Sequence, residues 1–276
     1  MEWLVFAGKG RRAVGLTMAG IGCCLAIAGG AAASSGPSER IVGGDVADPA
    51  DWPFIAAIAS RGGNQFCGGS VVAEEAVVTA AHCVMGSRPG SVRVITGRPD
   101  LDDKSQGQMI KVEKISVHRD YLRRRHHDIA VLNLKSRADV PPVLLPTVAE
   151  DAAETEAGDE LRVAGWGGTD ENGGHASDVL LDVALFAISD ADCSPYFDYF
   201  VASEEVCAFG ESQGPDLYND SCYGDSGGPL VADAPRGALL IGAVSYGGTK
   251  CGVKKPGVYA QIAANLNFIE RKAGLP

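Results

Sequence analysis

Gly224-Asp225-Ser226-Gly227-Gly228-Pro229-Leu230 is the most informative stretch of this chain. Alone it is a weak signal, because glycine, aspartate and serine are ordinary turn-forming residues. The motif becomes a strong signal together with two distant segments, Thr79-Ala80-Ala81-His82-Cys83 and Asp128-Ile129-Ala130-Val131-Leu132. Together the three segments supply a nucleophilic serine, a histidine base and a carboxylate that orients the base, in the chain order His, Asp, Ser.

Acyl transfer to a serine needs a base for the hydroxyl proton, a carboxylate that holds the base in one tautomer, and N–H donors that face the developing oxyanion. The expected catalytic residues are therefore His82, Asp128 and Ser226. We expect the backbone N–H groups of Gly224 and Ser226 to form the oxyanion hole, because glycine leaves room for a carbonyl to approach.

From Ile41 onward the pattern indicates an all-β protein. Ile262, Leu266 and Ile269 recur at spacings of four and three, which predicts a short C-terminal amphipathic helix. The prolines at 141, 142 and 146 and the acidic stretch Glu150–Glu160 predict a connector between two β domains of about 100 residues each. Periodicity alone does not separate a barrel from a sandwich. Clusters of Gly, Pro, Asn and Asp separate short apolar runs, as expected of strands and turns, at Ser70–Val72, Val77–Thr79, Val92–Thr96, Ile129–Leu134, Leu161–Trp166, Val179–Ile188, Ala238–Tyr246 and Val258–Ile262.

The N-terminal segment has the composition of a leader. Basic residues that include Arg11 and Arg12 precede an uncharged run, Ala13 to Ala33, that ends in three alanines. This pattern is typical of a secretory signal peptide, so we expect a signal peptide at 1–33, a short propeptide at 34–40 and a secreted, extracellular protein. The alternative is a transmembrane helix, since the run is long enough to span a bilayer, although its many Gly and Ala residues make it only mildly apolar. The Arg11-Arg12 pair also admits a twin-arginine export signal.

Removal of the leader discards Cys23 and Cys24 and leaves an even number of cysteines. An even number in a secreted protein predicts three disulfides, and spacing alone permits about fifteen pairings. No C-x-x-C pair remains, which argues against a zinc site. The six remaining cysteines are at positions 67, 83, 193, 207, 222 and 251.

The chain is acidic, with a formal charge of −11 at pH 7. Loss of residues 1–40 removes four basic and two acidic residues, which leaves −13. Such a surface argues against nucleic-acid partners and favours cationic substrates at long range. We expect no cofactor and no metal, because Asp48, Asp100, Asp102 and Asp103 are better interpreted as solvated acidic residues than as calcium ligands.

These motifs make the chain resemble the trypsin-like (chymotrypsin-fold) serine proteases, from Ile41 almost to the end. The resemblance rests on Ile41-Val42-Gly43-Gly44, on the three segments around His82, Asp128 and Ser226, and on Ser245-Tyr246-Gly247. It implies an all-β fold with two packed six-stranded antiparallel β-barrels and the catalytic residues at their interface. The expected peptidase domain is 41–276, with the N-terminal barrel at roughly 41–145, the C-terminal barrel at roughly 146–262 and the helix at roughly 263–273.

The resemblance also implies a disulfide pattern and a set of partners. The pairs would be Cys67–Cys83, Cys193–Cys207 and Cys222–Cys251, a reduced set that resembles bacterial, especially actinobacterial, trypsins. Protein and peptide substrates are the expected partners, with protein protease inhibitors as a further class. We expect a monomer with no membrane association after removal of the signal.

Asp220 lies six residues before Ser226, where trypsin-type members of the family place the carboxylate at the floor of the primary substrate pocket. A buried carboxylate without a partner is costly, so such a pocket favours a guanidinium or ammonium group. The resemblance therefore implies cleavage after Arg or Lys. Tyr246 stands where tryptophan is commonest, and the segment from Ser245 to Cys251 is one residue longer than in typical trypsins. The other expected pocket residues are Ser221, Ser245, Tyr246, Gly247 and Gly257, the glycines leaving room for a long side chain.

Arg40-Ile41 resembles a zymogen junction. The resemblance implies that the freed amino group of Ile41 turns inward to pair with Asp225, and that this ion pair orders the oxyanion hole and the pocket. We expect the mature enzyme itself to cleave after Arg40, because arginine suits a pocket built on Asp220.

The run Arg123-Arg124-Arg125-His126-His127 precedes Asp128, where the family has a loop that lines the second substrate subsite. Most charge runs are solvated faces, and we interpret His126 and His127 as solvated loop residues. One hypothesis is that Arg125 faces the cleft and favours acidic residues near the scissile bond. The alternative is that these arginines are sites of self-cleavage.

The sequence disfavours two other classes of function. A catalytically inactive binding protein on the same fold is disfavoured, because triad, oxyanion glycine, activation junction and pocket aspartate are all present. An esterase is disfavoured because its G-x-S-x-G serine precedes the acid and the histidine, and the order here is the reverse.

Overall fold

The computed structural model describes residues 43–276. The expected signal peptide and propeptide, and the junction Arg40-Ile41, lie outside the described residues. Among residues 43–276 no helix is both long and apolar enough to cross a membrane.

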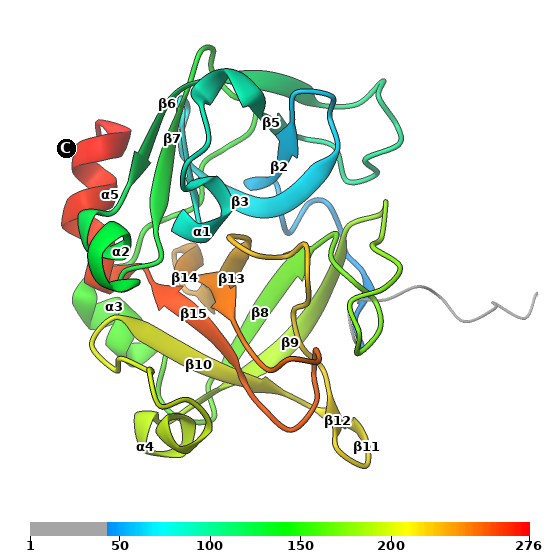
Figure 1. Cartoon of the computed structure of the whole chain (residues 1–276), viewed down its shortest axis with the longest axis vertical. Helices are drawn as coiled ribbons and strands as arrows, with labels where there is room; N and C mark the ends of the chain where they lie inside the picture. The colour runs from blue at the N-terminus through cyan, green and yellow to red at the C-terminus, as the bar shows by residue number, and fades with distance from the viewer. Residues whose placement is uncertain (1–42) are drawn as a thin grey trace, which may run out of the picture. The chain divides into compact units, whose positions relative to one another are not determined.

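Six antiparallel strands close the first barrel, in the order β2-β3-β4-β7-β6-β5 (Figure 1). Four of them are buried along almost their whole length, because one face fills the barrel and the other is covered by neighbouring segments. Their alanines and valines suit such closely packed positions. The strands are β2 (Ile55–Ser60), β3 (Gln65–Ala73), β4 (Ala76–Thr79), β5 (Val92–Thr96), β6 (Gln108–Val117) and β7 (Ala130–Leu134).

The second barrel follows in the chain and has its own core. Its strands run β9-β10-β15-β14-β13-β8, and a pairing between β8 and β9 closes the ring. Strand β9 alternates strictly between buried and partly exposed residues, the period of two expected when one face packs on a core. The strands are β8 (Glu160–Gly165), β9 (Leu181–Ile188), β10 (Glu205–Gly210), β13 (Pro229–Ala234), β14 (Gly237–Tyr246) and β15 (Gly257–Gln261).

Three short strands lie outside the two rings. Strand β1 (Asp45–Val46) extends the second barrel at β9, while β11 (Ser212–Gly214) and β12 (Leu217–Tyr218) pair with each other, and Leu217 also forms a bridge with Val253. The expected fold class is confirmed: two closed six-stranded antiparallel β-barrels carry a short C-terminal helix.

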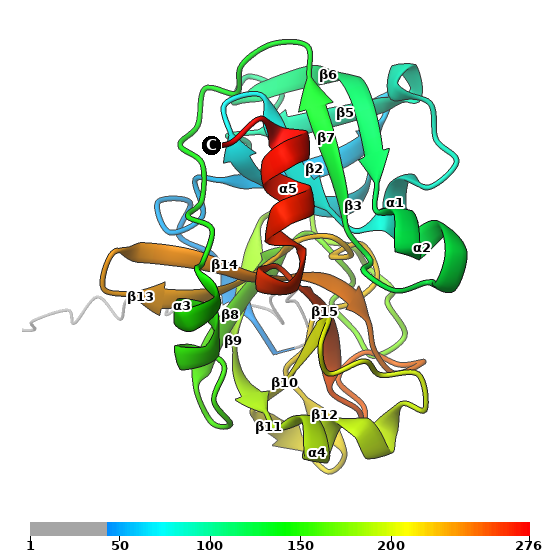
Figure 2. The same ribbon diagram turned by 90° about the vertical axis from the view of Figure 1, so that its left-hand side faces the viewer.

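That helix, α5 (Leu266–Ala273), follows the second barrel in sequence but packs on β7 and β4 of the first. Figure 2 shows it beside β7. Its buried Phe268 and Ile269 belong to the larger core cluster, which fills the first barrel and extends into the second. The side chain of Asn133 on β7 donates a 2.8 Å hydrogen bond to the carbonyl of Lys272. A turn of 3₁₀ helix, η3 (Ala263–Asn265), leads into α5.

The predicted connector contains a helix that composition did not indicate. Helix α3 (Val148–Ala153) begins with a capping box in which Thr147 and Glu150 satisfy each other's backbone N–H groups. Arg236 bonds the carboxylate of Glu150 at 2.5 and 2.9 Å. The remaining short helices are α1 (Ala81–Val84), α2 (Arg119–Arg124), α4 (Asp190–Cys193), η1 (Pro89–Ser91) and η2 (Ser194–Tyr196).

Three disulfides join Cys67 to Cys83, Cys193 to Cys207 and Cys222 to Cys251, the pairing that the resemblance implied. The first links β3 to α1, which carries His82. The third joins the segment before Ser226 to the segment after β14. Both therefore brace chain segments that carry expected site residues.

Candidate active site

His82 and Asp128 meet in the first barrel, although 46 residues separate them. Nδ1 of His82 lies 2.7 Å from Oδ2 of Asp128, and the backbone N–H of His82 donates to Oδ1 at 2.9 Å. Asp128 is buried, and its Oδ2 also accepts a 2.7 Å hydrogen bond from the hydroxyl of Ser245 in the second barrel. A carboxylate that accepts at Nδ1 keeps the proton there and leaves Nε2 free to act as a base.

The segment around Ser226 is a turn with little freedom. The N–H of Gly227 donates to the carbonyl of Val244 at 2.7 Å, and the N–H of Gly228 donates to that of Asp225 at 2.8 Å. Gly227 has a φ of +78°, and a β-carbon there would lie 2.2 Å from Oγ1 of Thr79. Only glycine fits this position, so the backbone on the carboxyl side of Ser226 is fixed.

Two N–H groups in this turn have no acceptor within residues 43–276. Those of Asp225, Gly227 and Gly228 donate to backbone carbonyls, whereas those of Gly224 and Ser226 do not. Gly224 has a φ of +103°, which glycine adopts without strain. Two unused donors beside a serine hydroxyl can bind an oxyanion.

Asp225 is completely buried in a cradle of glycines. Its Oδ1 accepts from the N–H of Gly167 at 2.7 Å and its Oδ2 from that of Cys222 at 2.9 Å. A β-carbon at Gly165 or Gly167 would lie 2.1 or 2.4 Å from a carboxylate oxygen of Asp225. Burial raises the pKa of Asp225 to about 6, and no cationic side chain among residues 43–276 pairs with it.

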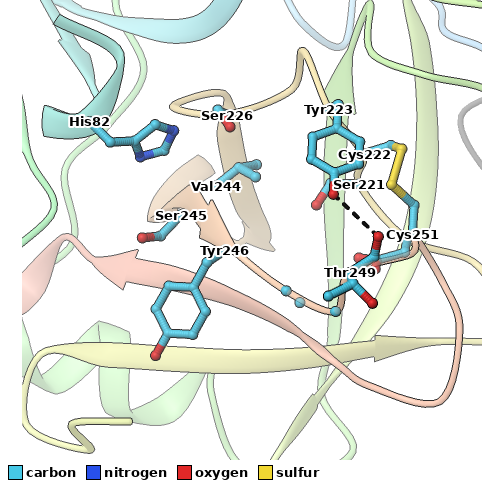
Figure 3. Close-up of a pocket in the computed structure, with 14 residues that line it drawn as sticks. His82, Ser221, Cys222, Tyr223, Ser226, Val244, Ser245, Tyr246, Thr249 and Cys251 are labelled. Atoms are coloured by element: carbon cyan, nitrogen blue, oxygen red, sulfur yellow. Dashed lines mark hydrogen bonds between the residues drawn. A yellow bond between two sulfur atoms is a disulfide. The ribbon is translucent and has the colours of Figure 1, made fainter. Parts of the chain in front are cut away.

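A cavity of about 490 Å³ opens beside Ser226 and His82 (Figure 3). Asp220 lies in its wall, buried, with Oδ2 accepting from the N–H of Gly252 at 3.0 Å. Burial raises the pKa of Asp220 to about 7. A β-carbon at Gly257 would lie 2.9 Å from Oδ1 of Asp220, so any larger residue there would press on the carboxylate. The cavity brings together all the pocket residues expected from sequence, Asp220, Ser221, Ser245, Tyr246, Gly247 and Gly257.

Two tyrosines at this cavity were not among the residues expected from the sequence. The ring of Tyr223 forms one wall, and its hydroxyl donates to the carbonyl of Thr249 at 3.3 Å, the bond marked in Figure 3. Behind Ser221, the buried hydroxyl of Tyr259 lies 3.3 Å from the serine hydroxyl. Tyr223 stands directly before Gly224, and this adjacency to the serine motif is the one signal that could have found it.

The interpretation of His127 as a solvated residue is wrong. Its side chain is 20% exposed, with Nε2 3.3 Å from Oε1 of Glu204 and Nδ1 3.0 Å from Oδ1 of Asn265. Its ring also lies 4.5 Å from that of His118. His126 is more exposed, at 39%, and its Nδ1 lies 3.4 Å from the same oxygen of Glu204. His127 therefore connects the first barrel to two other segments. One precedes β10 and carries Glu204, and the other precedes α5 and carries Asn265.

No set of free metal-ligating side chains occurs within the described part of the chain. The one group with suitable spacing there is Cys67, His82 and Cys83, and both cysteines are in a disulfide. Asp103, in the acidic loop, accepts from Ser105 and Gln106 of the same loop, which lowers its pKa.

A histidine oriented from one barrel and a serine held by the other, with an acidic cavity between them, are characteristic of serine proteases built on two β-barrels. The family model Trypsin matches residues 41–269. The chain is 36% identical over 233 residues to "Trypsin" of Saccharopolyspora erythraea, covering 83% of this chain and 96% of that protein. It is 35% identical over 246 residues to "Trypsin 5G1" of Aedes aegypti, covering 86% of each. The chain belongs to the trypsin family and is a serine endopeptidase.

Proposed function

We propose that this protease is a secreted endopeptidase that cleaves peptide bonds after Arg and Lys. The observation that carries the specificity is Asp220, a buried carboxylate in the wall of the cavity beside Ser226. Its high pKa reflects the cost of an unpaired buried charge, and a bound guanidinium or ammonium group would remove that cost. Gly247 and Gly257 leave the cavity open for the long side chain that carries such a group.

In the proposed mechanism Nε2 of His82 takes the proton of the Ser226 hydroxyl as Oγ attacks the carbonyl carbon. The N–H groups of Gly224 and Ser226 hold the negative oxygen that forms. Asp128 keeps the imidazole in the required tautomer and stabilises the imidazolium. The proton then passes to the leaving amine, and water, activated by His82, hydrolyses the acyl-enzyme.

The enzyme would be made as a zymogen cut between Arg40 and Ile41. Burial of Asp225 without a cationic side chain among residues 43–276 supports this, because a new N-terminal amine would supply the missing charge. The first described residue, Gly43, lies against Asn219, in the segment that leads to Asp225; a β-carbon at Gly43 would meet Oδ1 of Asn219 at 1.7 Å. An Arg40→Gln proenzyme should stay inactive, as N-terminal sequencing and peptide assays would show. Maturation of this variant to Ile41 would contradict self-cleavage.

Secretion is supported by the three disulfides, which fit an oxidising compartment. Expression in the native host with antibody detection in cells and medium would test it. A protein found only inside the cells, with its cysteines reduced, would contradict it.

Steady-state assays on chromogenic peptides ending in Arg, Lys or Phe test the activity itself. Wild type should cleave the Arg and Lys peptides, and Ser226→Ala should cleave none. Cleavage of Phe peptides alone would contradict the role of Asp220. Activity that survives Ser226→Ala would contradict the mechanism, and an inactive wild type with Ile41 at its N-terminus would favour a binding protein on this fold.

A further inference from the structure

A second cavity, of about 380 Å³, adjoins the first, and the two share His82, Ser245 and Tyr246 as walls. A peptide whose Arg or Lys side chain occupies the first cavity must continue past these shared residues. Successive side chains of an extended chain lie only about 3.3 Å apart along it, so a neighbouring side chain of the substrate enters the second cavity. Its remaining walls are Tyr121, Arg124, Arg125, His126, Asp128, Tyr199, Val201 and Glu205.

Arg125 is held in place at this cavity by groups that carry no negative charge. It ends α2 with a φ of +65°, and its N–H donates to the carbonyl of Tyr121 at 3.1 Å. Its guanidinium carbon lies 5.1 Å from the centre of the Tyr121 ring, and Nη1 lies 3.0 Å from the sulfur of Met85. An aromatic face and a thioether position a guanidinium but leave its charge uncompensated.

No carboxylate of residues 43–276 forms an ion pair with Arg123, Arg124 or Arg125. Two acidic side chains of this region are engaged elsewhere. Glu204 lies against His126 and His127, and Asp128 accepts from His82 and Ser245. In a chain with a formal charge of −11, uncompensated guanidinium groups beside the catalytic histidine are an exception to the general charge balance.

Glu205 is, after Asp128, the second carboxylate in the wall of this cavity. Its Oε2 accepts from the N–H of Val201 at 2.8 Å and from the hydroxyl of Tyr246 at 2.9 Å. Burial raises the pKa of Glu205, while the two donors that it accepts from act in the opposite direction. Its charge is therefore already partly compensated by donors, whereas that of Arg125 is not.

We propose that Arg125 makes the second cavity a subsite for an acidic side chain, so that the enzyme prefers Asp or Glu among the two residues directly preceding the cleaved Arg or Lys. The inference rests on the proposed function, because it places the cleaved residue in the first cavity. A guanidinium binds a carboxylate through two parallel N–H donors, a geometry that lysine does not reproduce. For a pair at a solvent-accessible cavity we expect a preference of about twofold to fivefold in kcat/KM.

The test uses matched peptides that end in the same Arg chromophore and carry Glu or Gln at either of the two preceding positions. The Glu-to-Gln ratio of kcat/KM is measured for wild type, Arg125→Gln and Arg125→Lys. Arg123→Gln is the matched control, because Arg123 belongs to the same run but does not line the cavity.

The ratio should exceed one in wild type, fall to one or below in Arg125→Gln, be partly kept in Arg125→Lys and be unchanged in Arg123→Gln. It should also shrink as salt is raised, because exposed ion pairs are screened. Equal ratios in wild type and Arg125→Gln at both positions, with the Gln peptides well cleaved, would overturn the subsite and leave the proposed function intact. Failure to cleave any Arg peptide would overturn both.

Discussion

The N–H group of Gly68, on β3 of the first barrel, donates a 2.8 Å hydrogen bond to the carbonyl oxygen of Ser226. The backbone of the proposed nucleophile is thus held by the barrel that carries the histidine. The contact is close: a β-carbon at Gly68 would lie 2.8 Å from Cα of Gly228. The position of the serine relative to His82 therefore depends on how the two barrels meet at this glycine.

Gly68→Ala should displace the serine turn without unfolding either barrel. Because a misplacement of about 1 Å costs on the order of 100-fold in rate, we expect kcat to fall by about that factor. Steady-state kinetics with circular dichroism would measure it. Gly62→Ala is the control, since a β-carbon there meets only the hydroxyl of Ser60, at 3.8 Å. A Gly68→Ala enzyme with wild-type kcat would show that the contact has no influence on catalysis.

Replacing Asp220 by serine should abolish the preference for basic residues. Loss of one partner from a buried ion pair costs about 3–5 kcal/mol, so kcat/KM on Arg and Lys peptides should drop by about 10²–10⁴-fold. Hydrolysis of an uncharged ester by the same variant reports whether the catalytic residues remain in place. If Asp220→Ser cleaved Arg peptides as well as wild type does, another residue would have to recognise the basic side chain of the substrate.

The pKa of about 7 at Asp220 predicts a pH-dependent pocket. A cation binds the ionised carboxylate, so affinity is full above pH 7 and decreases by up to about tenfold per unit below it as Asp220 takes up a proton. Titration of an arylamidine into the Ser226→Ala enzyme between pH 5 and 8 would measure this. Asp220→Asn should bind weakly at every pH. An affinity that does not change below pH 7 in wild type would contradict the raised pKa.

Asp151 is a second buried carboxylate, far from the cavity in sequence, with its pKa raised to about 6 by burial. Below about pH 3 its carboxyl is protonated in the folded and unfolded chains alike, so its ionisation has no effect on stability there. As pH rises toward 6 the unfolded chain ionises first, and the folded state loses about 2–3 kcal/mol of stability.

Asp151→Asn should therefore raise the melting temperature at pH 7.5 but not at pH 3. The amide oxygen can still accept from the side chain of Gln261, which donates to Oδ2 of Asp151 at 2.5 Å. Thermal unfolding in a Ser226→Ala background avoids self-digestion. An equal shift at both pH values would attribute the effect to packing rather than to ionisation.

His127→Ala should lower both stability and turnover, because it removes two side-chain contacts that hold the residue beside Asp128. Loss of buried hydrogen bonds costs about 1–3 kcal/mol, and a misoriented Asp128 should reduce kcat more than it changes KM. His126→Ala, at a more exposed neighbour, is the matched control and should change little. Equal effects of the two variants would show that the contacts of His127 do not position Asp128.

The residues proposed to bear the chemistry could be singled out in the sequence because they stand in local motifs. His82, Asp128, Ser226 and Asp220 each have neighbours in the chain that mark them. By contrast, the environment of His127 could not be predicted, since its partners lie 77 and 138 residues away and no local pattern connects them.

The fold shows the same division. Alternation of apolar residues predicted strands, but closure of each sheet depends on one pairing between strands, β8 with β9 or β2 with β5, that periodicity does not reveal. The barrel prediction therefore came from the resemblance alone. Helix α3 does have a local sequence signal, the Thr147-x-x-Glu150 capping box. This box lies in a segment whose prolines and acidic residues predicted a connector instead.

The position of α5 on the first barrel has a consequence for the order in which the protein can be finished during synthesis. Phe268 and Ile269 complete a core whose strands left the ribosome more than a hundred residues earlier. Until they emerge, the surface of β7 that follows directly from Asp128 has no cover. Phe268 and Ile269 therefore cover the strand that follows Asp128 only after the strands of both barrels have been synthesised.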